Sequence, residues 1–132
     1  MLTGGCHCGA IRYEIEGDQI NHMLCHCVDC QRTSGAPMVG WLMVKNEQLK
    51  VTGDPSIYPS SEHARRYFCI QCGTGLFYSN DDLIPGMVDI QSATLDEPDS
   101  VAPEAHVQVV DRIEWMKDAH TLREHAGWVA ET

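Results

Sequence analysis

The stretch Cys25-His26-Cys27-Val28-Asp29-Cys30 brings three thiols together within six residues. It overlaps a Cys-x-Cys motif with a Cys-x-x-Cys motif, and two further pairs flank it, in Cys6-His7-Cys8 and Cys69-Ile70-Gln71-Cys72. These clusters contain all seven cysteines of the chain. Because paired thiolates at such spacings are common metal ligands, we expect the chain to fold around thiolate-bound metal, with the middle cluster as the working site.

The role expected of the cysteines depends on the cell compartment, because thiols stay reduced in the cytoplasm. Residues 1–5 lack the basic and apolar segments of a signal peptide, and no apolar run is long enough to span a membrane. We therefore expect a cytoplasmic protein, in which clustered cysteines bind metal or catalyse more often than they form disulfides. Seven is also an odd number, so a closed disulfide framework would leave one cysteine unpaired.

The charge balance limits the possible partners. Nine basic and 19 acidic residues give a formal net charge of −10. Nucleic-acid binding leaves a basic footprint and an anionic membrane attracts a polybasic segment, and neither feature is present. We expect a small-molecule partner, and an anionic substrate would need a locally basic spot.

The pattern of apolar residues predicts an all-β fold. Residues 10–16 alternate between apolar and charged side chains, as in a half-buried strand, and residues 38–44 form a nearly continuous apolar run typical of a buried strand. Residues 31–37 are small and polar, and are expected to form a loop. Because no long segment has the helical period, we expect many short strands in a single domain over residues 1–132.

The two flanking cysteine pairs are suited to one closed zinc site. In an extended chain, residues two apart point to the same side, so Cys6 and Cys8 can face one ion. A Cys-x-x-Cys turn does the same for Cys69 and Cys72, and Gly73 suits the sharp turn. Four thiolates complete a tetrahedral zinc site, which is then structural and contributes folding energy.

Cys25, Cys27 and Cys30 remain as a group of three. Three protein ligands with one exchangeable position are typical of a catalytic zinc, and such an ion is expected to be labile. The open alternative is a second structural ion with His26 or another side chain as fourth ligand. Because His26 lies between two ligands and points away from them, a supporting or merely exposed role is favoured over ligation.

Four stretches resemble the family of glutathione-dependent formaldehyde-activating enzymes, also called the CENP-V/Gfa family. They are Gly4-Gly5-Cys6-His7-Cys8-Gly9-Ala10-Ile11-Arg12-Tyr13, then Cys25-His26-Cys27-Val28-Asp29-Cys30-Gln31-Arg32-Thr33-Ser34-Gly35-Ala36, then Phe68-Cys69-Ile70-Gln71-Cys72-Gly73-Thr74-Gly75-Leu76, and finally Pro103-Glu104-Ala105-His106-Val107 with Trp115. They follow the family's order and span most of the chain. A match in four parts is highly specific.

The resemblance implies an Mss4-like fold, in which several small, coiled antiparallel sheets surround a structural zinc. It assigns the same two cysteine sets, so two zinc ions per chain are expected. It also implies carbon–sulfur lyase activity, which interconverts glutathione and formaldehyde with S-hydroxymethylglutathione. One departure is Gln31, where a basic residue is frequent in the family.

Candidates for proton transfer and substrate binding lie outside the cysteine clusters. Alternation places Glu104 and His106 on one strand face, where they are candidate catalytic residues. The alternatives are a solvated Glu104 and a His106 packed against Trp115. Arg32 is the candidate contact for an anionic thiol such as glutathione.

Several other side chains are expected to have structural or surface roles. Arg65 and Arg66 alternate, so at most one can face the site, and both are expected to be solvated. Trp41 is expected in the core, and His22 at the surface.

Three functions are compatible with the sequence. The first is a zinc-dependent carbon–sulfur lyase acting on a small thiol adduct such as S-hydroxymethylglutathione. The second is a non-enzymatic, zinc-stabilised binding module of the same fold, and the third is a metal-buffering or redox-sensing protein that uses the middle cluster. A lyase needs an exchangeable metal position beside a pocket, whereas a binding module would have a closed second site or an exposed apolar patch.

Overall fold

The computed structural model describes residues 1–129, which fold into two β-sheets. The smaller sheet is antiparallel and has the order β1 (Leu2–Gly5), β2 (Arg12–Ile15) and β5 (Leu49–Thr52). The larger, seven-stranded sheet has the order β10 (Ala105–Val107), β3 (Asn21–Cys25), β4 (Val39–Lys45), β9 (Met87–Gln91), β8 (Gly75–Asn80), β7 (Ala64–Phe68) and β6 (Ser56–Tyr58). The expected all-β class is confirmed, although β10 pairs with β3 in parallel.

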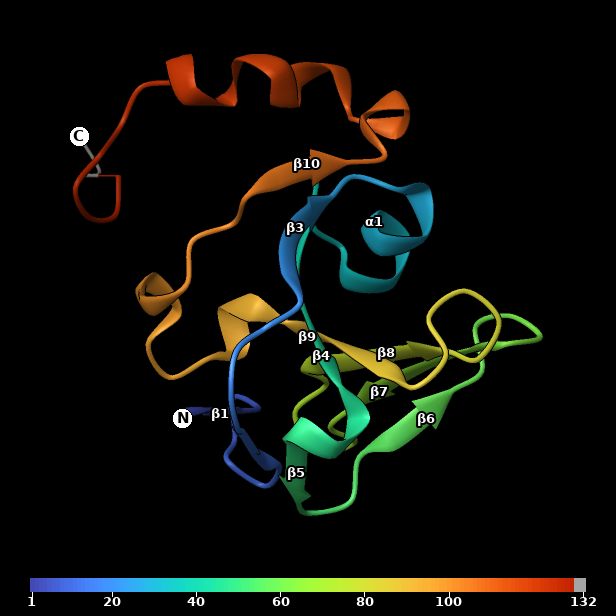
Figure 1. Ribbon diagram of the computed structural model, residues 1–132. Coiled ribbons are helices and arrows are strands. Elements are labelled where there is room, and N and C mark those ends of the chain that lie inside the picture. Colours follow the sequence, from blue (N-terminus) through green and yellow to red (C-terminus); the bar gives the residue numbers. More distant parts are fainter. Residues whose placement is uncertain (130–132) are drawn as a thin grey trace.

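Short helices connect the strands. The α-helix α1 (Val28–Ser34) follows β3 and lies beside it in Figure 1. The 3₁₀ helices are η1 (Asn46–Gln48), η2 (Ser92–Thr94), η3 (Pro98–Ser100), η4 (Val109–Asp111) and η5 (Glu114–Thr121). The expectation of a loop over residues 31–37 is therefore wrong for its first half. A seven-residue helix makes only about two turns, which is too short to show a helical period in the sequence.

The main core lies between the two sheets. The predicted alternation of β2 is confirmed, because Ile11, Tyr13 and Ile15 are buried. They form one apolar cluster with side chains of β4, β8 and β9, namely Leu42, Val44, Leu76, Phe77, Val88 and Ile90. Because alternate residues of a strand point to opposite faces, Trp41 and Met43 of β4 lie on the other face of the large sheet. That other face carries the candidate site.

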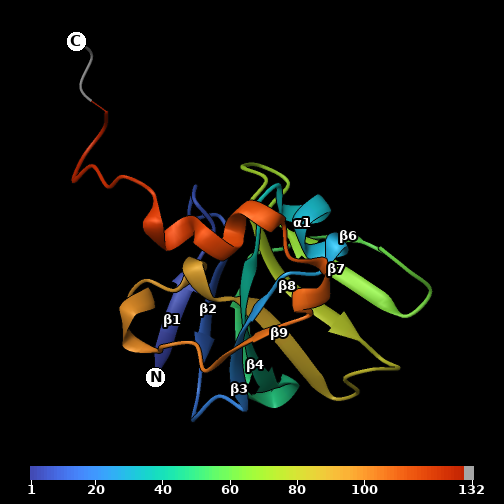
Figure 2. The same cartoon turned by 90° about the horizontal axis from the view of Figure 1, so that it is seen from above.

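The C-terminal segment is least integrated with the sheets. In Figure 2 residues 122–129, which follow η5, extend away from the sheets. Within residues 1–129, no helix has both the length and the apolar character needed to cross a bilayer. The expectation of a single domain over residues 1–132 stays a prediction, and residues 130–132 lie outside the described part.

Candidate metal centres and cavity

The two flanking cysteine pairs converge as expected. Cys6 and Cys8 follow β1, and Cys69 and Cys72 lie between β7 and β8. The four Sγ atoms lie within 4.8 Å of one another, with 3.6 Å between Cys6 and Cys8 and 3.7 Å between Cys8 and Cys69. Tetrahedral zinc with bonds of about 2.3 Å holds its sulfurs about 3.8 Å apart. This group therefore fits a metal ion with four thiolate ligands.

Matching glycine turns shape both pairs. Gly9 and Gly73 have φ values of 81° and 80°, in the left-handed region that favours glycine. The amide of Gly9 donates to the carbonyl of Cys6, and the amide of Gly73 donates to the carbonyl of Cys69. Each turn folds the backbone back so that its two thiols point the same way.

Hydrogen bonding favours the thiolate form of Cys72. The Cys72 Sγ lies 3.2 Å from the hydroxyl of Thr74. That side-chain hydrogen bond and the amides of Thr74 and Cys8 lower the pKa of Cys72 to about 5. A thiolate is the form that binds a metal ion, so the local backbone is suited to ligation.

The middle cluster is built where a strand meets a helix. Cys25 ends β3, Cys27 is the N-cap of α1, and Cys30 lies buried in the first helical turn. The Cys27 Sγ accepts a hydrogen bond of 3.2 Å from the amide of Cys30, and Gly35 closes the helix with φ 71°. The three Sγ atoms lie within 4.8 Å of one another. They form a second group that could hold a metal ion.

Trp41 connects the three-thiol group to the sheet. Its indole Nε1 donates to the Cys30 Sγ at 3.3 Å, and its ring lies 6.0 Å from the ring of Tyr78. The guanidinium of Arg66 lies 4.9 Å from the centre of the Tyr78 ring. The thiols are therefore joined through two aromatic rings to a cation.

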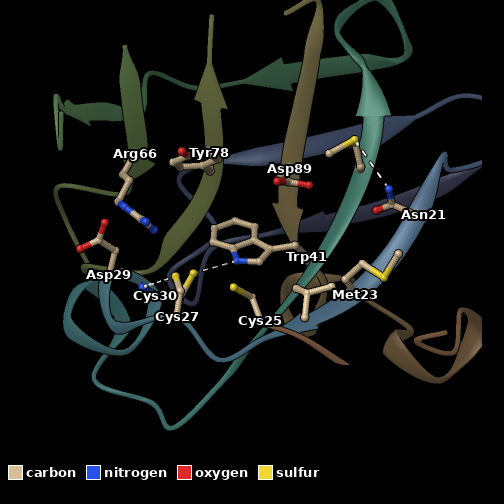
Figure 3. A pocket seen from close by; sticks show the side chains of 12 residues that line it. Asn21, Met23, Cys25, Cys27, Asp29, Cys30, Trp41, Arg66, Tyr78 and Asp89 are labelled. Carbon is tan, nitrogen blue, oxygen red and sulfur yellow. Dashed lines mark hydrogen bonds between the residues drawn. The ribbon is translucent and has the colours of Figure 1, made fainter. Parts of the chain in front are cut away.

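The three thiols line a cavity of about 400 Å³. Figure 3 shows Trp41 in its middle, between the cysteines and Asp89 in that view. The other lining residues are Asn21, Met23, Asp29, Met43, Arg66, Tyr78 and Val107. The combination of apolar walls with a few polar groups is typical of small-molecule sites.

A second cavity, of about 700 Å³, adjoins the first and shares Trp41 and Arg66 with it. Arg32 lines this second cavity and not the first. Arg66 lines both, so the expectation that it is merely solvated is wrong. Arg65 instead donates to the carbonyl of Ala64, which agrees with the expectation that at most one of these two neighbours faces the site.

Glu104 and His106 lie elsewhere. In β10, Val107 pairs with Cys25 and lines the cavity, so His106 is on the opposite face of the strand. The Glu104 Oε1 accepts from the amide of His22 at 3.0 Å. Among the described residues these two side chains help to attach β10 to β3, and their catalytic roles stay predictions.

The histidines near the site are more buried than expected. His26 is 1% exposed, and its Nε2 lies 2.8 Å from His106 Nδ1. His26 is therefore not exposed, and its ring contacts His106 of β10. His22 was expected at the surface but is buried, 2.8 Å from the hydroxyl of Ser92. The His106 ring lies 5.0 Å from the His26 ring, whereas Trp115 is 61% exposed, so the aromatic contact of His106 is with His26 and the alternative of packing against Trp115 finds no support.

Asp89 and Tyr78 were not among the predicted site residues. Asp89 lies at the centre of β9, and burial alone raises its pKa to about 6. Tyr78 lies beside it on β8. Neither residue belongs to a motif, and they meet the cysteines only through the pairing of strands from distant parts of the chain.

Comparison with known proteins identifies the family. Residues 1–111 match the family model described as glutathione-dependent formaldehyde-activating enzyme. The match covers most of the chain and both cysteine groups, so the chain belongs to this family. The resemblance noted in the sequence is confirmed.

Individual relatives are distant. A Schizosaccharomyces pombe protein named "Uncharacterized lyase" is 28% identical over 76 residues, which are 58% of this chain and 56% of that protein. A Halomonas elongata protein named "Putative glutathione-dependent formaldehyde-activating enzyme" is 23% identical, over 89% of this chain and 80% of that one. The match thus spans little more than half the length of the S. pombe relative.

A solved structure supports the fold alone. The crystal structure of a Rhodobacter sphaeroides protein aligns with a TM-score of 0.63 at 23% sequence identity. The alignment covers 80% of this chain and 99% of that chain.

Proposed function

We propose that this protein is a zinc-dependent carbon–sulfur lyase that interconverts a small thiol and formaldehyde with the S-hydroxymethyl thiol, glutathione being the favoured thiol. One observation carries the proposal: the three-thiol group, which is one ligand short of a tetrahedral set, lines a cavity large enough for a small molecule. The names of the family and of its relatives agree with this reaction class.

Zinc is the proposed ion at both groups. Thiolates prefer zinc to harder cations, and the four-thiol group offers a closed set whereas the three-thiol group leaves one position open. A zinc ion bound there would lower the pKa of a substrate thiol and polarise a carbonyl oxygen. Cys25, Cys27 and Cys30 would hold this ion, and the indole of Trp41 fixes the Cys30 sulfur.

The proposed reaction balances without an oxidant or reductant. The substrate thiol loses its proton and its sulfur forms a bond to the formaldehyde carbon. The carbonyl electron pair moves to the oxygen, which takes up a proton. In the lyase direction the hydroxyl loses that proton, the carbonyl forms again and the carbon–sulfur bond breaks. Met23, Met43, Val107 and Trp41 supply apolar walls that limit water near the reacting atoms.

Arg66 is proposed to select an anionic thiol. It lines both cavities, and no carboxylate among residues 1–129 forms an ion pair with it. A guanidinium binds a carboxylate through paired hydrogen bonds. Because the chain carries a net charge of −10, this local cation is what would let an anion such as glutathione bind.

The test compares Arg66→Gln with Arg65→Gln, a matched change at the neighbouring residue. The zinc-loaded protein is mixed with formaldehyde and glutathione or the neutral thiol 2-mercaptoethanol, and exchange NMR measures how fast each adduct forms and breaks. We expect the wild-type protein to exchange the adduct faster than buffer alone. In Arg66→Gln the KM for glutathione should rise about 10- to 100-fold, which corresponds to the loss of one or two charged hydrogen bonds. The KM for the neutral thiol should hardly change.

Two outcomes would contradict these proposals separately. If the wild-type protein binds two zinc ions but accelerates no thiol exchange, it is not a lyase of this kind. That result would favour the alternative of a non-enzymatic binding module. If Arg65→Gln and Arg66→Gln raise the KM equally, then Arg66 does not select the anion.

A further inference from the structure

A row of side chains crosses the large sheet opposite the thiols. In the strand registers Asn21 pairs with Met43, Met43 with Asp89, Asp89 with Tyr78, and Tyr78 with Arg66. All five line the cavity that holds the three-thiol group. Strand pairing therefore fixes a carboxyl group at the centre of the cavity wall, with an amide at one end of the row and a guanidinium at the other.

Asp89 has no partner that would explain a structural role. Within residues 1–129 no side chain donates a hydrogen bond to its carboxyl group, and burial is the one cause of its raised pKa. Asp96 shows the contrast in the same chain. It accepts hydrogen bonds from Arg12 and Thr3, the Arg12 bonds being the larger cause, and its pKa is lowered to about 2. A partly buried carboxyl without a partner, facing a cavity, suggests a ligand that supplies the missing contact.

We propose that Asp89 is the general acid–base of this cavity, and this rests on the proposed function. As the carbon–sulfur bond forms, the Asp89 carboxylic acid donates its proton to the aldehyde oxygen. As the bond breaks, the Asp89 carboxylate removes the proton from the hydroxyl of the adduct. Each synthesis leaves a carboxylate that takes up the proton released by the thiol, so the cycle balances.

The other titratable groups around the cavity are less suited to this role. Asp29 of α1 lines the cavity but is exposed. The Tyr78 hydroxyl accepts a hydrogen bond of 3.0 Å from Asn80. Arg66 of β7 is a permanent cation, and the three cysteines are the metal ligands. A carboxyl group with a pKa of about 6 is near the value at which one group can both donate and accept at neutral pH.

The experiment compares Asp89→Asn with Asp82→Asn, an exposed aspartate in the connection between β8 and β9. Initial rates of formaldehyde release from preformed S-hydroxymethylglutathione are measured between pH 5 and 8, after subtraction of the spontaneous rate, on protein with a determined zinc content. For the wild type, kcat in this direction should rise with pH and level off above about 6, because the carboxylate is the active form.

We expect Asp89→Asn to lower kcat by about 100- to 10,000-fold and to abolish this pH dependence, with KM and zinc content little changed. Asp82→Asn should keep the wild-type profile. If Asp89→Asn folds and keeps the wild-type kcat and profile, Asp89 is not the acid–base while the lyase proposal stands. If it fails to fold, Asp89 has a structural role and the proposal loses the observation that carries it. If the wild type itself releases no formaldehyde above the spontaneous rate, the lyase proposal fails and this role falls with it.

Discussion

At the scale of the single residue, the ionised form of Asp89 lowers the stability of the folded protein. Burial shifts its pKa from 3.8 to about 6, so the folded state binds this proton more tightly than the unfolded chain does. A shift of this size corresponds to about 3 kcal/mol of lost stability once the group is ionised. A residue whose ionised form destabilises the fold is a candidate for function, because packing does not account for it.

Asp89→Asn should therefore change how stability depends on pH. The folded-state pKa is raised, so the favourable contribution is fully present below pH 3.8 and is lost as the pH rises through about 6. Chemical denaturation at pH 5 and pH 8 should show that the variant loses less stability than the wild type over this interval, by about 1.5 kcal/mol, because the other half of the effect falls below pH 5. An equal loss in both proteins would show that Asp89 is not buried as the structure has it.

At the scale of the element, the helix α1 positions two of the three thiols of the middle cluster, Cys27 at its N-cap and Cys30 in its first turn. It was missed in the sequence because it has only seven residues and begins after a cysteine, whereas Ser, Thr, Asp and Asn are the usual N-caps. Its thiol cap has a hydrogen-bonding function that is separate from metal binding. If Cys27 also binds zinc as proposed, this one side chain has two functions that substitution can separate.

Cys27→Ser and Cys27→Ala should separate them. A serine hydroxyl can still accept the hydrogen bond from the amide of Cys30, whereas alanine cannot. Both variants should bind one zinc ion where the wild type binds two, and the alanine variant should be less stable than the serine variant by about 1 kcal/mol. Zinc analysis and urea denaturation measure the two effects. Two zinc ions in either variant would remove Cys27 from the ligand set.

At the scale of the whole molecule, the features that could be predicted are those that a short stretch of sequence encodes. Each cysteine pair is a pattern of three or four residues, and the alternation of β2 extends over a few more. Both patterns can therefore be recognised in short stretches of sequence. Asp89, Tyr78 and Arg66 reach the cavity through the register of three separate strands. No local pattern records that register, which is why the cavity wall was missed although the thiols were found.

The four-thiol group should control the stability of the whole fold. It joins the segment after β1 in the small sheet to the turn between β7 and β8 in the large sheet, and Cys69 is 1% exposed. Cys69→Ser should prevent folding or remove cooperative unfolding, because a four-thiolate ion contributes folding energy directly. Circular dichroism melting of Cys69→Ser against Cys27→Ser measures this. Equal melting temperatures would mean that the two cysteine groups share the structural role.

The separation of the two flanking pairs also sets an order of events on the ribosome. The three thiols of the middle cluster leave the ribosome almost together, whereas 61 positions separate Cys8 from Cys69. At about 5–20 residues per second, the second pair follows the first by roughly 3–12 s. Once Cys30 has been made, the new chain carries the complete three-thiol set, whereas Cys6 and Cys8 still lack the second pair of the four-thiol group. The four-thiol group, which is the one predicted to stabilise the fold, is therefore the later of the two groups to be completed.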